Sequence, residues 1–193
     1  MAKDTSGVFP FALRVIAWGV ALFALWFLAA RPVSLAVAWG ASALLHAMAP
    51  IERAPPRWNE GKVSFDVELD GAITYRKAIP PGAVFEVPVN PLRQTFGLPF
   101  FLALLAASRP ARIGRRAALG TAILLALASL GLACEVSVNL GHVVGPDGAA
   151  LIGSSALAAS LTALGLQLGT LIFPTVVPLM LWAAMDDRYF RAT

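Results

Sequence analysis

The sequence contains few of the residues that usually build catalytic and metal sites. Its 193 residues include one cysteine, two histidines and only 13% charged residues, whereas soluble globular domains carry about 25%. A single cysteine excludes an intrachain disulfide and a structural zinc site made of cysteines. No P-loop, HExxH, GxSxG or GxGxxG motif occurs in a suitable context, so the sequence implies no nucleotide cofactor and no metal cofactor.

Apolar residues are abundant instead. Hydrophobic residues make up 58% of the chain and the mean hydropathy is +0.73, values that indicate an integral membrane protein in contact with lipid. The apolar runs leave about forty residues for a water-soluble part, which excludes a large soluble catalytic domain. The net charge of +4 comes from cations scattered at the ends of apolar runs. We interpret them as topology signals and expect no nucleic-acid partner.

Four apolar segments are predicted to cross the membrane: residues 11–30, 92–108, 117–134 and 163–185. A helix rises about 1.5 Å per residue and the hydrocarbon core is about 30 Å thick, so a crossing needs roughly twenty residues. The first segment is longer than the apolar part of a signal peptide and is predicted to be an uncleaved span. The second segment is short and must recruit the polar residues near Arg93 at one end.

Arginines in short loops predict the orientation. The loop between the second and third segments carries Arg109, Arg112, Arg115 and Arg116, and the C-terminal tail carries Arg188 and Arg191. Because cytoplasmic loops are enriched in Lys and Arg, this loop and the C-terminus are predicted to be cytoplasmic. Residues 49–91 then lie on the opposite side, together with the connection 134–162, and four crossings place the N-terminus inside.

Residues 33–48 allow two interpretations. They are apolar enough for a fifth crossing, which would put the N-terminus outside, but sixteen residues are few for a span. A narrow polar stripe lies on one helical face, formed by Ser34, Ala38, Ser42 and His46. We favour an interfacial or re-entrant helix kinked at Pro32.

The segment 49–91 is predicted to form a three-stranded antiparallel meander. Residues 62–69 alternate apolar and polar side chains, and Asp70-Gly71 favours a tight hairpin turn into a second strand over 72–79. Residues 80–82 form the next turn and 83–89 the third strand. So small a sheet needs a cover on its apolar face, which the membrane surface, the 33–48 helix or a partner protein would supply.

The predicted fold class is a membrane all-α bundle of about four transmembrane helices, or five if 33–48 crosses, with a small extracytoplasmic β-meander. The chain is predicted to divide into three regions: an anchor with the interfacial or re-entrant helix over 1–48, the meander over 49–91, and a three-span region over 92–193.

The joint between the meander and the second span is unusually polar. Pro91 ends the strand because it lacks a donor, and it biases Asn90 towards an extended backbone. Gly97 is expected to let the β-insert approach the helices closely, and Pro99 is tolerated if the helix begins or bends near it. We therefore expect Asn90 and Gly97 to tolerate substitution poorly.

The candidate catalytic pair is Cys134 with His142, eight residues apart at the outer end of the third span. A thiolate nucleophile needs a neighbouring base or cation, which a histidine supplies. The alternative is that Cys134 behaves as a small apolar residue in an Ala/Leu helix, and we favour this alternative.

The last span combines small, polar and helix-breaking residues. Gly165 and Gly169 form a small-xxx-small pair that permits close helix packing. Gln167 places an amide in an apolar segment, and Pro174 and Pro178 each remove a backbone donor and bend the helix. A transporter subunit uses such a broken helix for substrate binding, but a kinked packing helix is the interpretation we favour.

Two blocks resemble the exosortase H-associated membrane proteins. They are NPLRQTFGLPFFLALLAAS, from Asn90, and ALGLQLGTLIFPTVVPLMLW, from Ala163, with the closing DDRYF. The resemblance implies an accessory protein of the bacterial inner membrane, beside an exosortase, a multi-pass cysteine transpeptidase that sorts proteins, and either the enzyme or its substrates as partners. Ala133-Cys134 is followed by Glu135-Val136 rather than Ser-Gly, so the match to an exosortase itself fails after two residues.

Overall fold

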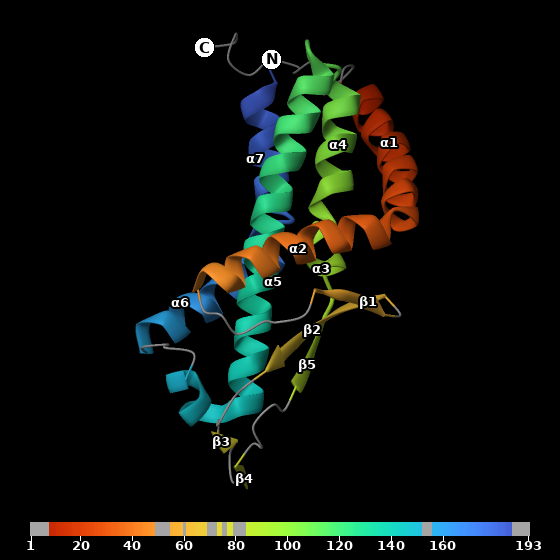
Figure 1. Cartoon of the computed structure of the whole chain (residues 1–193). Coiled ribbons are helices and arrows are strands. Elements are labelled where there is room, and N and C mark those ends of the chain that lie inside the picture. Colours follow the sequence, from red (N-terminus) through yellow and green to blue (C-terminus); the bar gives the residue numbers. More distant parts are fainter. Residues whose placement is uncertain are drawn as a thin grey trace.

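The computed structural model describes residues 8–48, 55–59, 61–68, 73–74, 77–78, 84–151 and 156–186. Its helices form an elongated bundle at one end, and a small β-sheet lies beyond the bundle at the other end (Figure 1). Helix α2 lies between these two parts and runs across the bundle, whereas α1, α4, α5 and α7 run roughly along it.

The bundle consists of α1 (Val8–Leu28), α4 (Gly97–Ser108), the first part of α5 (Ile113–Leu151) and α7 (Val176–Met185). Its core is formed by side chains of α4 and α5, with α7 packed against them: Leu98, Phe101, Leu105 and Leu124. Helix α1 packs on α4 but leaves large apolar side chains exposed, such as Phe9 at 76% and Phe27 at 70%. A surface of this kind is suited to lipid rather than water.

The membrane prediction is confirmed in its coarse form. Among the described residues, Phe9–Leu28 and Ile113–His142 are each long and apolar enough to cross a membrane, in agreement with the first and third predicted spans. Ala156–Ile172 and Val176–Met185 satisfy the criterion together, as one span bent by 64°. Leu92–Ser108, where the second span was predicted, is a shorter apolar helix. The described chain thus has two candidate spans, or three if the bent pair is one span.

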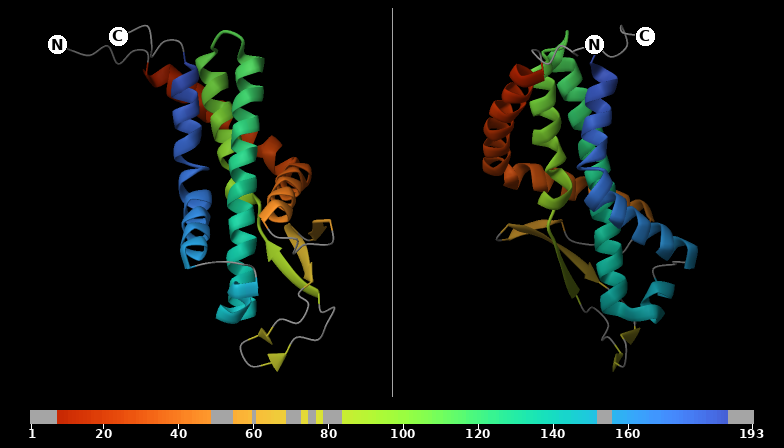
Figure 2. Two further views of the ribbon diagram at one scale, coloured as in Figure 1. Left: turned by 60° about the vertical axis from the view of Figure 1, so that its left-hand side comes forward. Right: turned by 180° about the vertical axis from the view of Figure 1, so that it is seen from behind.

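Several contacts tie the helices together near the turn between α4 and α5, where α1 begins and α7 ends (Figure 2). The Trp182 indole N–H donates to Ser108 Oγ at 3.0 Å, and its ring stacks on Phe11 at a centroid distance of 6.0 Å. The Arg116 guanidinium donates to the backbone carbonyl of Met185. These contacts therefore connect all four helices at this end of the bundle.

Helix α2 (Ala30–Met48) does not run alongside the other helices, which agrees with the interfacial interpretation of 33–48. The break from α1 falls at Ala29, so the predicted kink at Pro32 is wrong. Pro32 lies in the first turn of α2, where a missing N–H costs no intrahelical hydrogen bond. Ser34 and Ser42, two members of the polar stripe, are buried, and His46 is exposed.

The three-stranded sheet has the order β1–β2–β5, all antiparallel, with β1 (Arg57–Asn59), β2 (Lys62–Glu68) and β5 (Val84–Val89). The predicted middle strand over 72–79 is wrong, because β2 pairs directly with β5 and Phe65 lies opposite Val87. Within that segment, β3 (Ile73–Thr74) pairs only with β4 (Lys77–Ala78). The predicted turns at 70–71 and 80–82 lie outside the described residues.

Strand β1 is instead the third strand of the sheet, at its edge, and β2 is the middle strand. Strand β1 lies in a proline-rich and charged stretch that was not predicted to be a strand. Gly61 has a φ of +83°, a conformation that glycine adopts without steric cost, and it turns the chain from β1 into β2. The alternating apolar positions of β2 and β5 then supply the buried face of the sheet.

This face packs against α2 and the part of α5 from Leu132 to Leu140. The shared core contains Val63, Phe65, Val67, Val87 and Val89 of the sheet, Val37, Ala38 and Ala41 of α2, and Leu132, Val136 and Leu140 of α5. Full burial of each large apolar side chain contributes roughly 1.5–3 kcal/mol. Of the three covers that the sequence left open, the 33–48 helix is the one that the structure shows, and α5 is a second cover.

Helix α5 continues well past the predicted end of the third span. We expected residues 134–162 to be a connection, but α5 extends to Leu151 and is followed by α6 (Ala156–Gln167). The packing of Val136 and Leu140 against the sheet core explains this continuation, because tertiary contacts outweigh weak helix propensity.

Glycines allow α5 to approach the last helical segment closely. A Cβ on Gly131 would lie 2.9 Å from Gly169 Cα, which belongs to the π-helical turn η2 (Leu168–Ile172). A Cβ on Gly165 would lie 2.6 Å from Cys134 Sγ. The small-residue face of Gly165 and Gly169 is thus occupied by α5 within this chain.

The bend predicted at the proline pair falls between η2 and α7, next to Pro174. The Phe173 N–H donates to Leu168 O at 2.8 Å, which is a π-type bond, and the helix direction changes by 64°. Gly97 lies against this bend: its Cβ would be 2.6 Å from the Pro174 carbonyl oxygen and 2.9 Å from the Pro178 ring. Its close neighbours are therefore on the last helix rather than on the β-insert.

Substitution of Gly97 is expected to destabilise the bundle. In Gly97→Leu the new side chain meets backbone atoms of Pro174, which cannot move aside as a flexible side chain would. Overpacking of this kind costs about 1–3 kcal/mol, so thermal unfolding of the purified protein in detergent should show a lower Tm. Gly19→Leu is the matched control, because a Cβ at Gly19 meets nothing within 4 Å. Equal Tm values for the two variants would contradict the close contact.

Candidate functional site at the helix–sheet junction

The site begins where β5 leads into α3 (Leu92–Thr95). Asn90 Oδ1 accepts a hydrogen bond from the Leu92 backbone N–H at 3.1 Å, and the Pro91 carbonyl accepts from the N–H groups of Gln94 and Thr95. The Asn90 side chain therefore satisfies one of the N–H groups that a helix start leaves unpaired. This turn fixes the direction of α3 and the position of the two polar side chains that follow.

Gln94 points into the protein and holds a carboxylate of α5. Its side chain is 4% exposed, and its Nε2 donates to Glu135 Oε2 at 2.7 Å. The bond joins residues 41 positions apart in sequence. Gln94 Oε1 is buried and has no hydrogen-bond partner among the described residues. The positive charge of Arg93, the neighbour of Gln94, acts on the same carboxylate through space.

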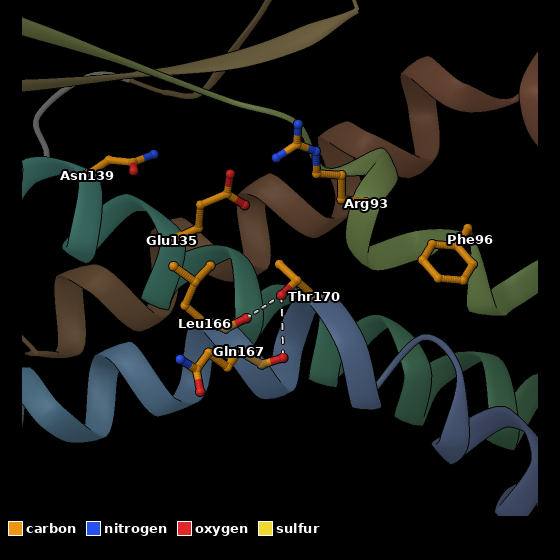
Figure 3. Close-up of a pocket in the computed structure, with 7 residues that line it drawn as sticks. All are labelled: Arg93, Phe96, Glu135, Asn139, Leu166, Gln167 and Thr170. Atoms are coloured by element: carbon orange, nitrogen blue, oxygen red, sulfur yellow. Dashed lines mark hydrogen bonds between the residues drawn. The ribbon is translucent and has the colours of Figure 1, made fainter.

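An open groove of about 550 Å³ lies beside this pair (Figure 3). Residues from four segments line it: Arg93 and Phe96 at the α3–α4 junction, Glu135 and Asn139 from α5, Leu166 and Gln167 from α6, and Thr170 from η2. Arg93, Glu135 and Asn139 extend to the same side of the helices. The Thr170 hydroxyl donates to Leu166 O at 2.9 Å, so its proton is used within its own helix.

The groove combines one cation, one carboxylate and two amides with apolar walls. Arg93 and Gln167 are exposed, whereas Glu135 and Asn139 are half-buried. Such a set can bind a polar group that carries both charges and an adjoining apolar group. Among the residues that the structure describes, no group of three His, Cys, Asp or Glu side chains could hold a metal ion.

The candidate catalytic pair is not brought together. Cys134 Sγ lies against Gly165, whereas His142 is an exposed residue of the same helix. Eight helical residues separate their backbones by about 12 Å along the axis. The position of Cys134 is that of a small residue in a helix contact.

The sequence singled out two of the seven residues that line the groove. Arg93 lies in the polar joint before the second predicted span, and Gln167 is an amide in the last predicted span. Glu135 and Asn139 were not predicted to belong to a site. Their i, i+4 spacing puts them on one face of α5, which is the signal that could have paired them.

The Gln94–Glu135 hydrogen bond is expected to stabilise the junction. Gln94→Leu leaves the half-buried carboxylate without its donor, which should cost about 1–3 kcal/mol. The double variant Gln94→Leu with Glu135→Leu should recover part of this loss, because neither polar group is then left alone. A double-mutant cycle of unfolding free energies in detergent measures the coupling. Additive effects of the two substitutions would show that the bond contributes nothing.

Comparisons with known proteins give one match. No curated protein and no solved structure matches the chain. The family described as exosortase H-associated membrane protein matches residues 5–189, nearly the whole length. This match confirms the resemblance seen in the two sequence blocks and agrees with the apolar helices of the structure. The chain belongs to the family of exosortase H-associated membrane proteins.

Proposed function

We propose that this protein is a multi-pass accessory protein of the bacterial inner membrane that assists exosortase-dependent protein sorting at the periplasmic face. Its partners on this proposal are the exosortase or the substrates that the enzyme sorts. The observation that carries the proposal is the family match over residues 5–189. The fold supports it, because a small sheet is held rigidly at one end of an apolar helix bundle.

The proposed orientation follows from the arginines. The turn between α4 and α5 contains Arg109 and Arg112, and α1 begins and α7 ends near it. By the positive-inside rule this end is cytoplasmic. Residues 49–91 and the sheet that they contribute then face the periplasm, and so does the outer half of α5.

The sheet is the surface that we propose for the partner. The small-residue face of Gly165 and Gly169 is filled by α5, so it is not free for a second protein. On β5, by contrast, Val84 is 60% exposed and Glu86 is also exposed. One face of the sheet is part of the packed core with α2 and α5, and the proposed docking surface is the opposite face. Because this core already orders the sheet, binding of a partner there costs less conformational entropy.

Site-specific crosslinking tests this assignment. A photo-crosslinking residue at Val84 or Glu86 should form an adduct with the exosortase or with one of its sorted substrates in membranes of cells that contain these proteins. The same residue at Arg115 is the matched control, because Arg115 is exposed in the first turn of α5, at the end of the bundle away from the sheet. Adducts only from Arg115, or the absence of adducts with both the exosortase and its substrates, would contradict the proposal.

A further inference from the structure

The proposed binding of a partner uses the sheet and gives no role to the polar groove beside Gln94 and Glu135. The groove holds an exposed cation, Arg93, and a half-buried carboxylate, Glu135; the charge of Arg93 acts on this carboxylate through space, but no salt bridge joins the two among the described residues. Charges that neighbour each other without pairing remain available to a ligand. The matching ligand carries one negative and one positive group side by side.

The carboxylate is already oriented for such a ligand. Gln94 Nε2 donates to Oε2 of Glu135 at 2.7 Å and holds the side chain in place. Gln94 is itself buried, so the orientation does not depend on a mobile surface residue. A carboxylate that accepts one bond from an amide retains acceptor capacity for an ammonium group.

Apolar surface adjoins the polar groove. Phe96 and Leu166 line it. On the neighbouring α6 and η2, Leu164 is 49% exposed and Leu171 is 66% exposed. Amides of Asn139 and Gln167 add donors and acceptors at the rim. A ligand with a charged head and long hydrocarbon chains fits this order of surfaces.

We propose that the groove binds a phospholipid whose headgroup carries a phosphate and a primary ammonium, as in phosphatidylethanolamine. Arg93 binds the phosphate and Glu135 accepts hydrogen bonds from the ammonium. The acyl chains lie along the exposed leucines of α6 and η2. Phosphatidylglycerol lacks the ammonium and phosphatidylcholine has no N–H to donate, so both lack the bond to Glu135.

The test uses the purified full-length protein in detergent, titrated with phosphatidylethanolamine, phosphatidylglycerol or phosphatidylcholine of identical acyl chains. Native mass spectrometry measures the bound fraction of each lipid. Phosphatidylethanolamine should bind several-fold tighter than the other two. Glu135→Gln should weaken its binding about tenfold and remove the preference, because a bond to a charged group is lost. Glutamine still accepts from Gln94, so this variant keeps the internal bond.

Two further variants separate the headgroup contacts. Arg93→Gln, at an exposed position, should weaken all three phosphate-bearing lipids, whereas Arg115→Gln at the other end of the bundle should change none of them. Soluble glycerophosphoethanolamine, which lacks acyl chains, should not bind at the same concentration.

Equal binding of the three lipids, an unchanged preference in Glu135→Gln, or equally strong binding of the soluble headgroup would overturn the proposal. The measurement contains no exosortase, so its outcome is independent of the sorting role.

Discussion

The structure depends on one continuous helix, α5, that contributes side chains to two hydrophobic cores. The first part of α5 packs against α4 and α7 through Leu124, and its later part packs against α2 and the sheet through Leu132, Val136 and Leu140. Because the helix does not break between them, the sheet is fixed relative to the bundle. Glu135 and Asn139 lie on the same part of α5 as Val136 and Leu140, but they line the groove instead of the sheet core. The polar groove therefore lies beside the part of α5 that holds the sheet.

The groove is held together by short-range contacts from several segments. Asn90 and Pro91 set the start of α3, and Gln94 reaches from there to Glu135 on α5. Glycine contacts bring α6 and η2 against α5, which completes the opposite wall. A side chain added at Gly131 or Gly169 would push this wall away. A polar site therefore results from the same close packing that stabilises the membrane helices, without a separate soluble domain.

The sequence predicted the elements better than their pairing. Hydropathy located the apolar helices, and the alternation in Val63, Phe65 and Val67 located β2 and its buried face. The partner of β2 was missed, because strand pairing depends on contacts between distant segments such as Phe65 and Val87, which local alternation does not specify. The extension of α5 was missed for a similar reason: its helical state beyond Cys134 depends on the sheet that covers Val136 and Leu140. Arg93 and Gln167 were recognisable as polar exceptions, but their meeting with Glu135 required the bend at Pro174 and the glycine contacts.

We propose that α5 leaves the membrane near Glu135 and continues on the periplasmic side. Single cysteines in a Cys134→Ser background, treated with a membrane-impermeant maleimide in spheroplasts, test it directly. His142→Cys lies beyond Glu135 and Arg115→Cys lies near the α4–α5 turn, and both positions are exposed. His142→Cys should be labelled in intact spheroplasts, and Arg115→Cys should be labelled only after permeabilisation. Labelling of Arg115→Cys alone in intact spheroplasts, or of both positions, would contradict it.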